Sequence, residues 1–350
     1  IQGSDYQVTL TLTRPNGVLP QLLDIPISLG TGDRPLGTGP YILTDVEGDL
    51  CLTARADWHG GSGNLPIQQI ALSPMSRTEE QISSFNAGEI TLVNADLTGS
   101  SNLEVSSQYQ VWDYPTTQLL YVGFNVQQGL CQDAALRRAI AQAIDREYVS
   151  DTIFARHALP AALPVHPNTP WYDTQLAEEW RYDPSPLEAL SLNRRPITLV
   201  VNIEHTAKSS AANYIAQQLE EAGLVVTVER LPWEEYQAAL AQGQFDLYLG
   251  EVYLTPDFDL TPLVGTGGNL NYGGWTSTVI DSLLAAFRSA QGNDRIAAAS
   301  ALYQQLCQQA PIAPICFRSG TMLTQYGRVE GAAPVYGNLF SQLDRWSILE

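Results

Sequence analysis

The chain has 350 residues, of which 44% are hydrophobic and 16% are charged, and its formal net charge is −19. This acidic balance, with Lys208 as the one lysine, argues against nucleic-acid binding, because neutralising phosphates requires clustered Lys and Arg, and it also disfavours docking on anionic lipid. No segment approaches the ~18–20 consecutive apolar residues of a membrane-spanning helix.

The length suggests about two domains. The chain begins with Ile1 rather than Met, and its first residues show no signal-peptide pattern. We therefore expect a processed or trimmed chain.

Near the N-terminus, residues 5–14 alternate apolar and polar side chains with a period of two, which predicts a half-buried strand. Gly-Thr-Gly-Pro-Tyr at 37–41 then permits a tight reversal before a hairpin over residues 42–54. This motif lacks the Gly-x-x-x-x-Gly-Lys-Ser/Thr spacing of a phosphate-binding loop, and a strand pattern rather than a helix follows it.

A helix is predicted at about residues 78–87, between strands at 67–72 and 90–93. Gly88 suits the position after a helix that requires a positive φ. The first third of the chain is therefore expected to be mainly strands and turns with one helix.

The stretch 119–154 carries the strongest local pattern. An apolar run ends at Phe124-Asn125 and predicts a strand. Asp133 is a good N-cap for the helix that follows, because its carboxylate can accept from the free N–H groups of the first turn. Apolar residues at i, i+4, i+7 and i+8 spacing predict an amphipathic helix, with Arg137 and Arg146 off the apolar stripe.

Residues 157–186 are rich in Pro, Trp and Tyr without clear periodicity and are expected to form a long surface loop. Residues 196–249 show a βαβαβ pattern, which implies right-handed crossovers and a largely parallel sheet. Helices at about 276–290 and 293–309 and strand segments over 311–324 follow. A nucleotide-binding Rossmann unit is disfavoured, because the GxGxxG turn is absent after the first strand.

No catalytic constellation stands out: the sequence lacks GxSxG and HExxH motifs, and its histidines are dispersed. We therefore predict that the chain is not an enzyme and binds no cofactor or metal. His157 and His166 flank one loop, and solvated loop histidines are favoured there over a shared metal. The four cysteines form no CxxC motif. Free thiols are favoured over disulfides, and disulfide pairing stays open as the alternative.

Residues 250–275 follow the carboxyl end of a predicted parallel strand, where loops in open α/β sheets collect ligands. The segment is rich in Gly, Asn, Tyr and acidic groups, which is the composition of an adaptable recognition loop. The alternative is an ordinary surface loop.

Several ordered motifs resemble those of the family 5 solute-binding proteins of ABC importers, which include oligopeptide-, dipeptide- and nickel-binding proteins. The matching motifs are Tyr121-x-x-Phe124-Asn125, Leu136-Arg137-Arg138-Ala139, Ala143-Ile144-Asp145-Arg146-Glu147, GTGPY at 37–41, the turn Asp57-Trp58-His59-Gly60-Gly61, and Phe85-Asn86-Ala87-Gly88-Glu89-Ile90. In residues 250–275, Gly250, Asp257, Asn271 and Tyr272 match the family pattern.

The departures from the pattern matter for function. Leu130-Cys131 stands where Pro-Phe is usual, Glu251 replaces a Trp, and Leu254 replaces the Asp that accepts a peptide's α-ammonium group in peptide-binding members. Either Glu251, Asp257 or Asp259 supplies that negative charge from a shifted position, or the ligand has no free N-terminus.

The resemblance implies an α/β, two-lobe periplasmic-binding-protein-like fold of class II topology, with mixed sheets and helices on both faces. One lobe would contain residues 1–125 and 321–350, and the other residues 126–320 with the βαβαβ core. The chain would be the extracellular solute-binding component of an ABC importer, a cell-surface lipoprotein or periplasmic protein that traps a peptide or similar solute by hinge closure and delivers it to the permease. The ligand-binding residues would be Asn125, Glu251, Tyr253, Asp257, Asn271, Tyr272 and Trp275.

Full family members carry a further N-terminal segment, so the chain is expected to be trimmed or an unusually short member. Lobe one would then have exposed strand edges, and we expect weakened ligand binding and self-association. Two other functions stay open: a hydrolase or transferase that uses the α/β lobe, and a scaffold or sensor that kept the fold and lost the ligand.

Overall fold

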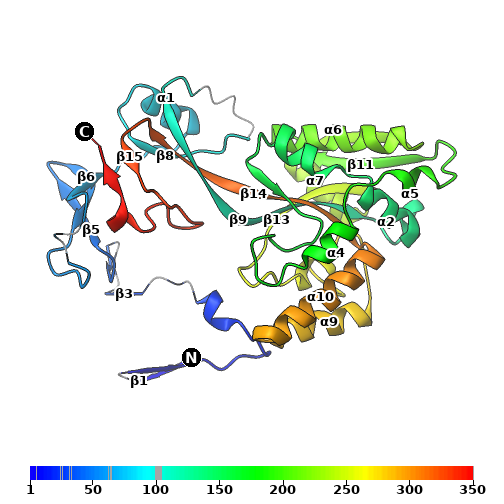
Figure 1. Cartoon of the computed structure of the whole chain (residues 1–350), viewed down its shortest axis with the longest axis horizontal. Helices are drawn as coiled ribbons and strands as arrows, with labels where there is room; N and C mark the ends of the chain where they lie inside the picture. Colours follow the sequence, from blue (N-terminus) through cyan, green and yellow to red (C-terminus); the bar gives the residue numbers. More distant parts are fainter. Residues whose placement is uncertain are drawn as a thin grey trace. The chain divides into compact units, whose positions relative to one another are not determined.

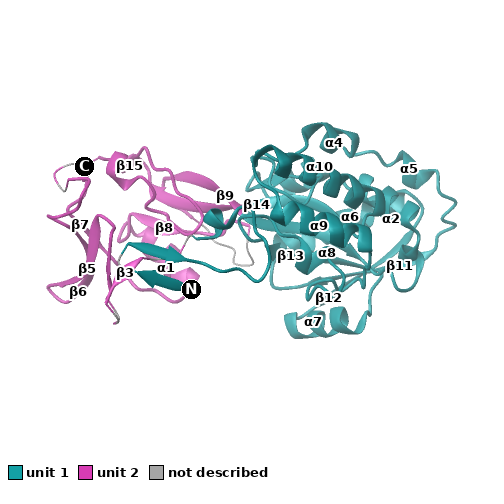
Figure 2. Ribbon diagram, turned by 90° about the horizontal axis from the view of Figure 1, so that it is seen from below, with its two compact units in different colours: residues 1–23, 117–318 teal, residues 24–116, 319–350 magenta. Residues whose placement is uncertain are grey.

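The structure is a computed structural model that describes residues 1–4, 6–23, 25, 27–30, 32, 34–61, 63, 65–98 and 105–349. The chain divides into two compact units (Figure 2): unit 1 contains residues 1–23 and 117–318, and unit 2 contains residues 24–116 and 319–350. The strands β9 (Tyr109–Phe124) and β14 (Ile312–Gln325) each continue from one unit into the other.

These limits differ from the lobe limits expected from the resemblance. Residues 1–23 belong to unit 1, where Asn16 and Gly17 hydrogen bond to Asp257 and Arg288. The end of β9 also lies in unit 1, because it pairs along its length with β13.

Unit 1 is built on a mixed sheet with the strand order β10-β14-β9-β13-β11-β12. The strands not yet defined are β10 (Ala158–Pro160), β11 (Pro196–Asn202), β12 (Val225–Leu231) and β13 (Leu247–Tyr253). β11 pairs in parallel with both β12 and β13, whereas β13 is antiparallel to β9 and β10 is antiparallel to β14. The predicted βαβαβ core is therefore present, with antiparallel strands added on one side.

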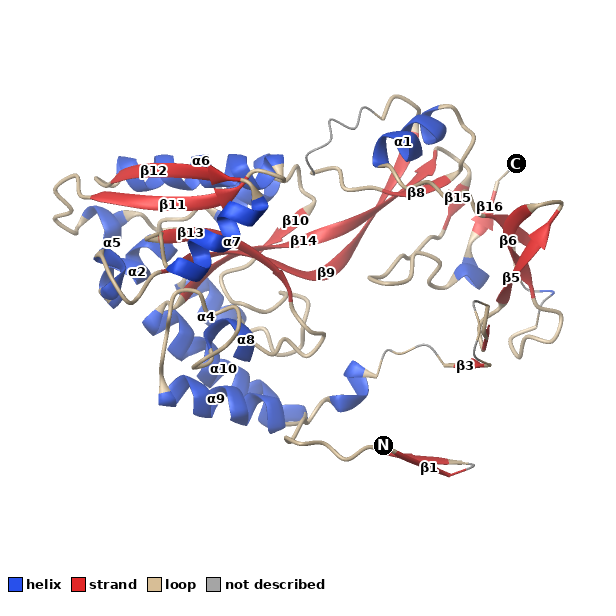
Figure 3. Ribbon diagram, turned by 180° about the vertical axis from the view of Figure 1, so that it is seen from behind, coloured by secondary structure: helices blue, strands red, loops and turns tan. Residues whose placement is uncertain are grey.

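Helices cover both faces of this sheet (Figures 1 and 3), and each face has its own apolar core. One core is formed with α2 (Ala134–Gln142), α5 (Ser185–Glu188) and α6 (Thr206–Glu221). The other is formed with α4 (Thr174–Glu179), α7 (Trp233–Gln242), α8 (Thr261–Val264), α9 (Thr278–Ser289) and α10 (Gly292–Gln309). This two-sided burial explains the continuous apolar runs of the central strands.

The helix predicted after Asp133 is shorter than expected. Asp133 caps it by accepting from the Ala135 N–H at 2.8 Å, as predicted, but α2 ends at Gln142. Asp145 then caps a new helical turn, α3 (Arg146–Tyr148), which leads into the π-helical segment η4 (Val149–Ile153). The second cap breaks the helix because the Asp145 side chain accepts from the Tyr148 N–H at 2.9 Å.

Two arginines outside the apolar stripe of this region are buried. Arg137 is 2% exposed, and its guanidinium donates to the backbone carbonyls of Cys131, Gln132, Gln309 and Ala310. Arg146 is 7% exposed and donates to the carbonyls of Ala141 and Pro314. Arg137 therefore ties this region to the residues just before β14, and Arg146 ties it to β14 itself.

Unit 2 has smaller sheets. The hairpin β5 (Tyr41–Val46) and β6 (Asp49–Ala54) turns at Glu47 and Gly48, both with positive φ, and β7 (Gln69–Ala71) extends it. β8 (Leu92–Asn94) pairs with the Met322–Thr324 part of β14 and packs with α1 (Thr78–Asn86). The predicted hairpin and the positive φ of Gly88 are confirmed.

The remaining elements are short: β1 (Gln2–Ser4), β2 (Gln7–Thr9), β3 (Ser28–Leu29), β4 (Leu36–Gly37), β15 (Val329–Glu330), β16 (Ser347–Ile348), η1 (Leu19–Leu22), η3 (Leu130–Gln132) and η5 (Leu343–Arg345). The prediction of a half-buried strand over residues 5–14 is wrong for the part of this range that the structure describes. β1 and β2 form a separate hairpin, in which Tyr6 is 100% and Val8 69% exposed.

Candidate functional site

The carboxyl ends of β11 and β13 lie at the same edge of the unit 1 sheet, because the two strands are parallel neighbours. β11 ends at Asn202 and is followed by α6, while β13 ends at Tyr253 and is followed by the segment 254–275. The edge therefore gathers polar residues from separate parts of the chain.

The β13 backbone is positioned by two tyrosines that lie over two glycines. In the β9–β13 ladder, Tyr121 is opposite Gly250 and Tyr248 is opposite Gly123. A Cβ on Gly250 would lie 2.5 Å from the Tyr121 ring, and one on Gly123 would lie 2.1 Å from the Tyr248 ring. The two rings meet edge to face at 5.7 Å between centroids, which fixes β13 immediately before Glu251.

Glu251 and Arg318 form an ion pair at this edge. Nη1 of Arg318 donates to Oε1 of Glu251 at 2.8 Å, and the side chains are 6% and 17% exposed. The guanidinium also lies 5.6 Å from the centre of the Phe154 ring. Because water is largely excluded, the attraction between these charges is stronger than in an ordinary surface ion pair. Removing one partner would leave the other charge buried without a countercharge, which is costly.

Lys208 completes this group of charges. It is 3% exposed, Nζ donates to Oδ1 of Asn202 at 2.6 Å, and Nζ lies 5.3 Å from the Tyr236 ring centre. Burial lowers the pKa of Lys208 to about 8; the charge of Glu251 raises it, and the charge of Arg318 lowers it. We call Lys208, Glu251 and Arg318 the charge cluster.

The structure does not bring the seven predicted ligand residues together. Asn125 follows β9 at the opposite end of β13, where Nδ2 donates to the carbonyls of Gly243 and Phe245 at 3.1 and 3.0 Å. From Asp246, next to Asn125, to Glu251 the strand spans roughly 17 Å at ~3.3 Å per residue.

Asn271 and Trp275 lie at the same end as Asn125. Asn271 Nδ2 donates to the carbonyls of Gly265 and Trp275, and Oδ1 accepts from the Trp275 N–H at 3.0 Å, so its amide closes a turn. The neighbouring Gly273 carbonyl accepts from the Val126 N–H. Trp275 stacks beside Arg137, with 5.4 Å from the guanidinium carbon to the ring centre.

Asp257 is buried inside unit 1. It is 3% exposed and accepts from Nδ2 of Asn16 at 3.2 Å and from Oγ1 of Thr255 at 2.6 Å. Leu254, where the family pattern has Asp, is 7% exposed and belongs to the apolar core. Both residues therefore stabilise the segment rather than face solvent.

The two predicted tyrosines differ in exposure. Tyr253 is 53% exposed at the end of β13, opposite Gln118. Tyr272 is partly buried and packs edge to face on Tyr248 at 6.0 Å. Of the seven residues, Glu251 and Tyr253 lie at the sheet edge where the charge cluster is found.

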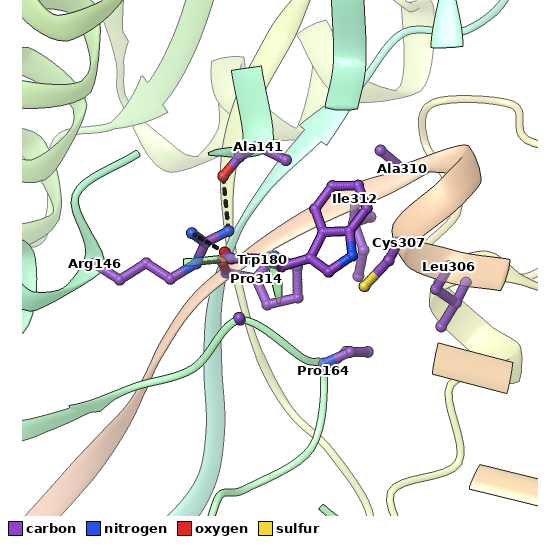
Figure 4. Close-up of a pocket in the computed structure, with 10 residues that line it drawn as sticks. Ala141, Arg146, Pro164, Trp180, Leu306, Cys307, Ala310, Ile312 and Pro314 are labelled. Atoms are coloured by element: carbon purple, nitrogen blue, oxygen red, sulfur yellow. Dashed lines mark hydrogen bonds between the residues drawn. The ribbon is translucent and has the colours of Figure 1, made fainter. Parts of the chain in front are cut away.

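Unit 1 has two other concave regions. Figure 4 shows a small pocket of about 20 Å³ in which Arg146 donates to Ala141 and Pro314 beside Trp180. This volume holds about one water molecule. A larger, open groove of about 560 Å³ is lined by Trp171, Tyr172, Asp173, Thr174, Asn293, Ile296, Ala297 and Ser300.

Within the described ranges, no group of three or more His, Cys, Asp or Glu side chains is placed to hold a metal ion. His166 is 6% exposed rather than solvated, and burial lowers its pKa. No helix in the described part of the chain is both long and apolar enough to span a membrane. The four cysteines, Cys51, Cys131, Cys307 and Cys316, are free thiols.

Sequence reasoning missed Lys208 and Arg318. One signal for each was present: Lys208 is the sole lysine and stands in the first turn of a helix, and Arg318 ends an apolar run, Ile312 to Phe317. The ion pair of Arg318 with Glu251, and the electrostatic effect of Glu251 on Lys208, depend on tertiary structure and left no local pattern.

The sequence matches the family described as bacterial extracellular solute-binding proteins, family 5 Middle, over residues 2–271. Among curated relatives, "Heme-binding protein A" of Haemophilus influenzae is 21% identical, covering 82% of this chain and 55% of its own length. "Probable di/tripeptide-binding protein 5" of Pseudomonas aeruginosa is 22% identical, covering 93% of this chain and 67% of its own. The chain thus spans between about half and two thirds of these relatives.

Among solved structures, the ABC transporter substrate-binding protein CtaP of Listeria monocytogenes superposes with a TM-score of 0.76 at 20% identity. The superposition covers 91% of this chain and 68% of that one. The likeness confirms the predicted two-lobe binding-protein fold, with mixed α/β structure.

Proposed function

The chain belongs to the bacterial extracellular solute-binding proteins of family 5, and on that premise we propose that it captures a peptide or similar small solute for an ABC importer. The family match over residues 2–271 carries this proposal. The proposed setting is outside the cytoplasmic membrane, with an ABC permease as the partner. Lipoprotein anchoring and hinge closure stay predictions from the resemblance.

The charge cluster and Tyr253 support the sheet edge as the ligand-contacting part of unit 1. Tyr253 offers an exposed ring, and Glu251 offers a partly exposed carboxylate beside a buried cation. Small-solute sites typically combine aromatic surface with a few fixed polar groups, and these residues provide both.

Native mass spectrometry of the purified chain tests the proposal first, because a captured solute would add a discrete mass. Calorimetry with di- and tripeptides then measures binding, with haem as a second probe because one relative is named for binding it. Tyr253→Ala should weaken binding about tenfold by loss of apolar contact. Tyr326→Ala, at an exposed tyrosine of unit 2, is the matched control. Absence of binding by every probe, with no co-purified mass, would refute solute capture.

A scaffold or sensor that has lost its ligand is the second candidate. The burial of Leu254 favours it, since the position that matches an ammonium-binding Asp is part of the core. The same experiment separates the two functions. Self-association through strand edges also stays a prediction, which sedimentation velocity measures directly.

A further inference from the structure

The open groove between the start of α4 and helix α10 shares no lining residue with the charge cluster. The two helices lie side by side (Figures 1 and 3), and Oγ of Ser300 on α10 donates to Oδ2 of Asp173, the N-cap of α4, at 2.5 Å. The groove volume of about 560 Å³ lies within the ~300–1,000 Å³ that is typical of small-molecule sites. The groove is therefore large enough to hold an organic molecule.

The lining of this groove combines apolar surface with one charged side chain. Trp171 and Tyr172 contribute aromatic rings, and Ile296, which is 44% exposed, contributes aliphatic surface. Burial raises the pKa of Tyr172, so its hydroxyl is neutral. Among the described residues that line the groove, Asp173 is the charged one. The charge that the lining presents to a ligand is therefore negative.

Asp173 is held in place, yet it can accept further hydrogen bonds. Oδ1 accepts from the Leu176 N–H at 3.0 Å and so caps α4, while Oδ2 accepts from Ser300. The hydrogen bond from Ser300, and after it that from Leu176, lower the pKa of Asp173, so the carboxylate is ionised at neutral pH. An ionised carboxylate offers about four acceptor positions. Part of this capacity remains for a ligand.

The described residues give Asp173 no ion-pair partner. Arg295 lies against the Trp171 ring, with 4.8 Å from the guanidinium carbon to the ring centre. Its Nη1 and Nη2 donate to the carbonyls of Phe287 and Asp257, at 2.8 and 2.6 Å. Burial lowers the pKa of Arg295, and the carboxylate of Asp257 raises it, which offsets the guanidinium charge. The donors of Arg295 are thus used in the interior of unit 1.

The exposed charged residues near the groove do not balance Asp173 either. Arg181 follows α4 and already pairs with Glu178 at 3.3 Å. Glu179 at the end of α4 and Asp294, which follows the lining residue Asn293, are both acidic and exposed. These neighbours therefore add to the negative charge of the groove.

We propose that this groove is a second ligand site of unit 1, selective for small organic cations that have an apolar part. The cationic group bonds to Asp173, and the hydrocarbon part contacts Trp171 and Ile296. Asp173 is the specificity residue, because it supplies the countercharge. The site is separate from the sheet edge, so it does not depend on solute capture there.

Two ligands of nearly the same size, 2-phenylethylamine and 2-phenylethanol, test the selectivity at pH 7 because they differ in charge. Labelling the whole chain with ¹⁵N-tryptophan gives indole N–H signals, and Trp171→Phe identifies the signal from the groove. The amine should shift the Trp171 signal and bind about tenfold more tightly than the alcohol, which one partly desolvated ion pair can supply. Equal affinities, or a Trp171 signal that stays unchanged at ~10 mM amine, would overturn the proposal.

Variants assign the selectivity to Asp173. Asp173→Asn removes the charge but can still cap α4 and bond to Ser300, so it should weaken amine binding about tenfold and leave alcohol binding unchanged. Asp183→Asn is the matched control, because Oδ1 of Asp183 accepts from the Ser185 N–H at 3.0 Å at the start of α5, away from the lining residues. It should change neither affinity. Ile296→Ser should weaken both ligands by about threefold through lost apolar contact. A preference for the amine that survives in Asp173→Asn would contradict the assignment.

Discussion

Arg318 on β14 forms an ion pair with Glu251 on β13, with 2.8 Å between Nη1 and Oε1, although strand β9 lies between these two strands in the sheet. Glu251→Gln keeps the shape but removes the countercharge of Arg318 and of Lys208. We expect the free energy of unfolding to fall by ~2–4 kcal/mol, because removing one partner leaves a buried charge uncompensated. Urea denaturation measures the change.

Glu229→Gln is the matched control for this substitution, since Glu229 is an exposed residue on β12. It should change the free energy of unfolding by less than ~0.5 kcal/mol. Equal effects of the two substitutions would show that the Arg318–Glu251 pair contributes no more than a surface charge.

Lys208 allows a direct measurement of a buried ammonium, because a chain with one lysine gives one side-chain signal after labelling with ¹⁵N-lysine. Burial lowers the pKa of Lys208 to about 8 from an ordinary 10.5, so the signal should titrate near pH 8. The same measurement in urea supplies the unfolded reference. A midpoint near 10.5 in the folded chain would contradict the burial of this charge.

The same shift predicts how stability depends on pH. Between pH 8 and 10.5 the unfolded chain keeps the Lys208 proton that the folded chain has released, so unfolding binds a proton and this contribution to stability rises with pH. Relative to Lys208→Met, the folded chain should gain ~3 kcal/mol across this window. The comparison with the variant is needed because buried tyrosines and thiols with raised pKa act in the opposite direction. A difference that stays constant from pH 8 to 10.5 would refute the linkage.

Local patterns predicted the elements of unit 1 well. Helices α9 and α10 both lie within two residues of their predicted limits, because apolar spacing defines these helices without tertiary help. The Asp133 cap was predictable for the same reason. The second cap at Asp145 was not, since an aspartate inside an apolar periodicity gives no sign that its side chain will accept from Tyr148.

The candidate site was less predictable because its residues meet only in three dimensions. Lys208, Glu251 and Arg318 come from α6, β13 and β14, up to 110 residues apart. Asn125 and Trp275 were expected beside Glu251, but the segment 254–275 runs back to the start of β13, where the Gly273 carbonyl accepts from the Val126 N–H. A sequence motif shows that a segment follows a strand. It does not show in which direction that segment then runs across the sheet.

Arg137 should contribute more to stability than any surface arginine. It is 2% exposed, and its guanidinium donates only to backbone carbonyls, at 2.6 to 3.2 Å, which joins η3 to the end of α10. Arg137→Met should lower the free energy of unfolding by ~2–4 kcal/mol, because the carbonyls of Cys131 and Ala310 lose a donor in buried surroundings. Arg137→Lys should restore little, since an ammonium cannot reproduce the planar set of donors.

The neighbouring Arg138 gives the control for Arg137. It is partly exposed, and Nη1 donates to the Gln308 carbonyl at 3.2 Å. Arg138→Met should cost less than ~1 kcal/mol in urea denaturation. An equally small loss of stability in Arg137→Met would contradict the prediction. It would mean that the carbonyls around residues 131 and 309 accept hydrogen bonds from other donors in the variant.

The thiols of Cys131, Cys307 and Cys316 should be inert in the folded chain. Burial raises the pKa of each to about 12, from an ordinary value of 9. Since the thiolate is the nucleophile, alkylation by iodoacetamide at pH 8 should be roughly a thousandfold slower than in urea. Mass spectrometry of the peptides follows each cysteine separately. Cys307 is the sharpest case because it is partly exposed: fast alkylation there, with Cys131 and Cys316 protected, would show that solvent reaches this thiol despite the packing of α10.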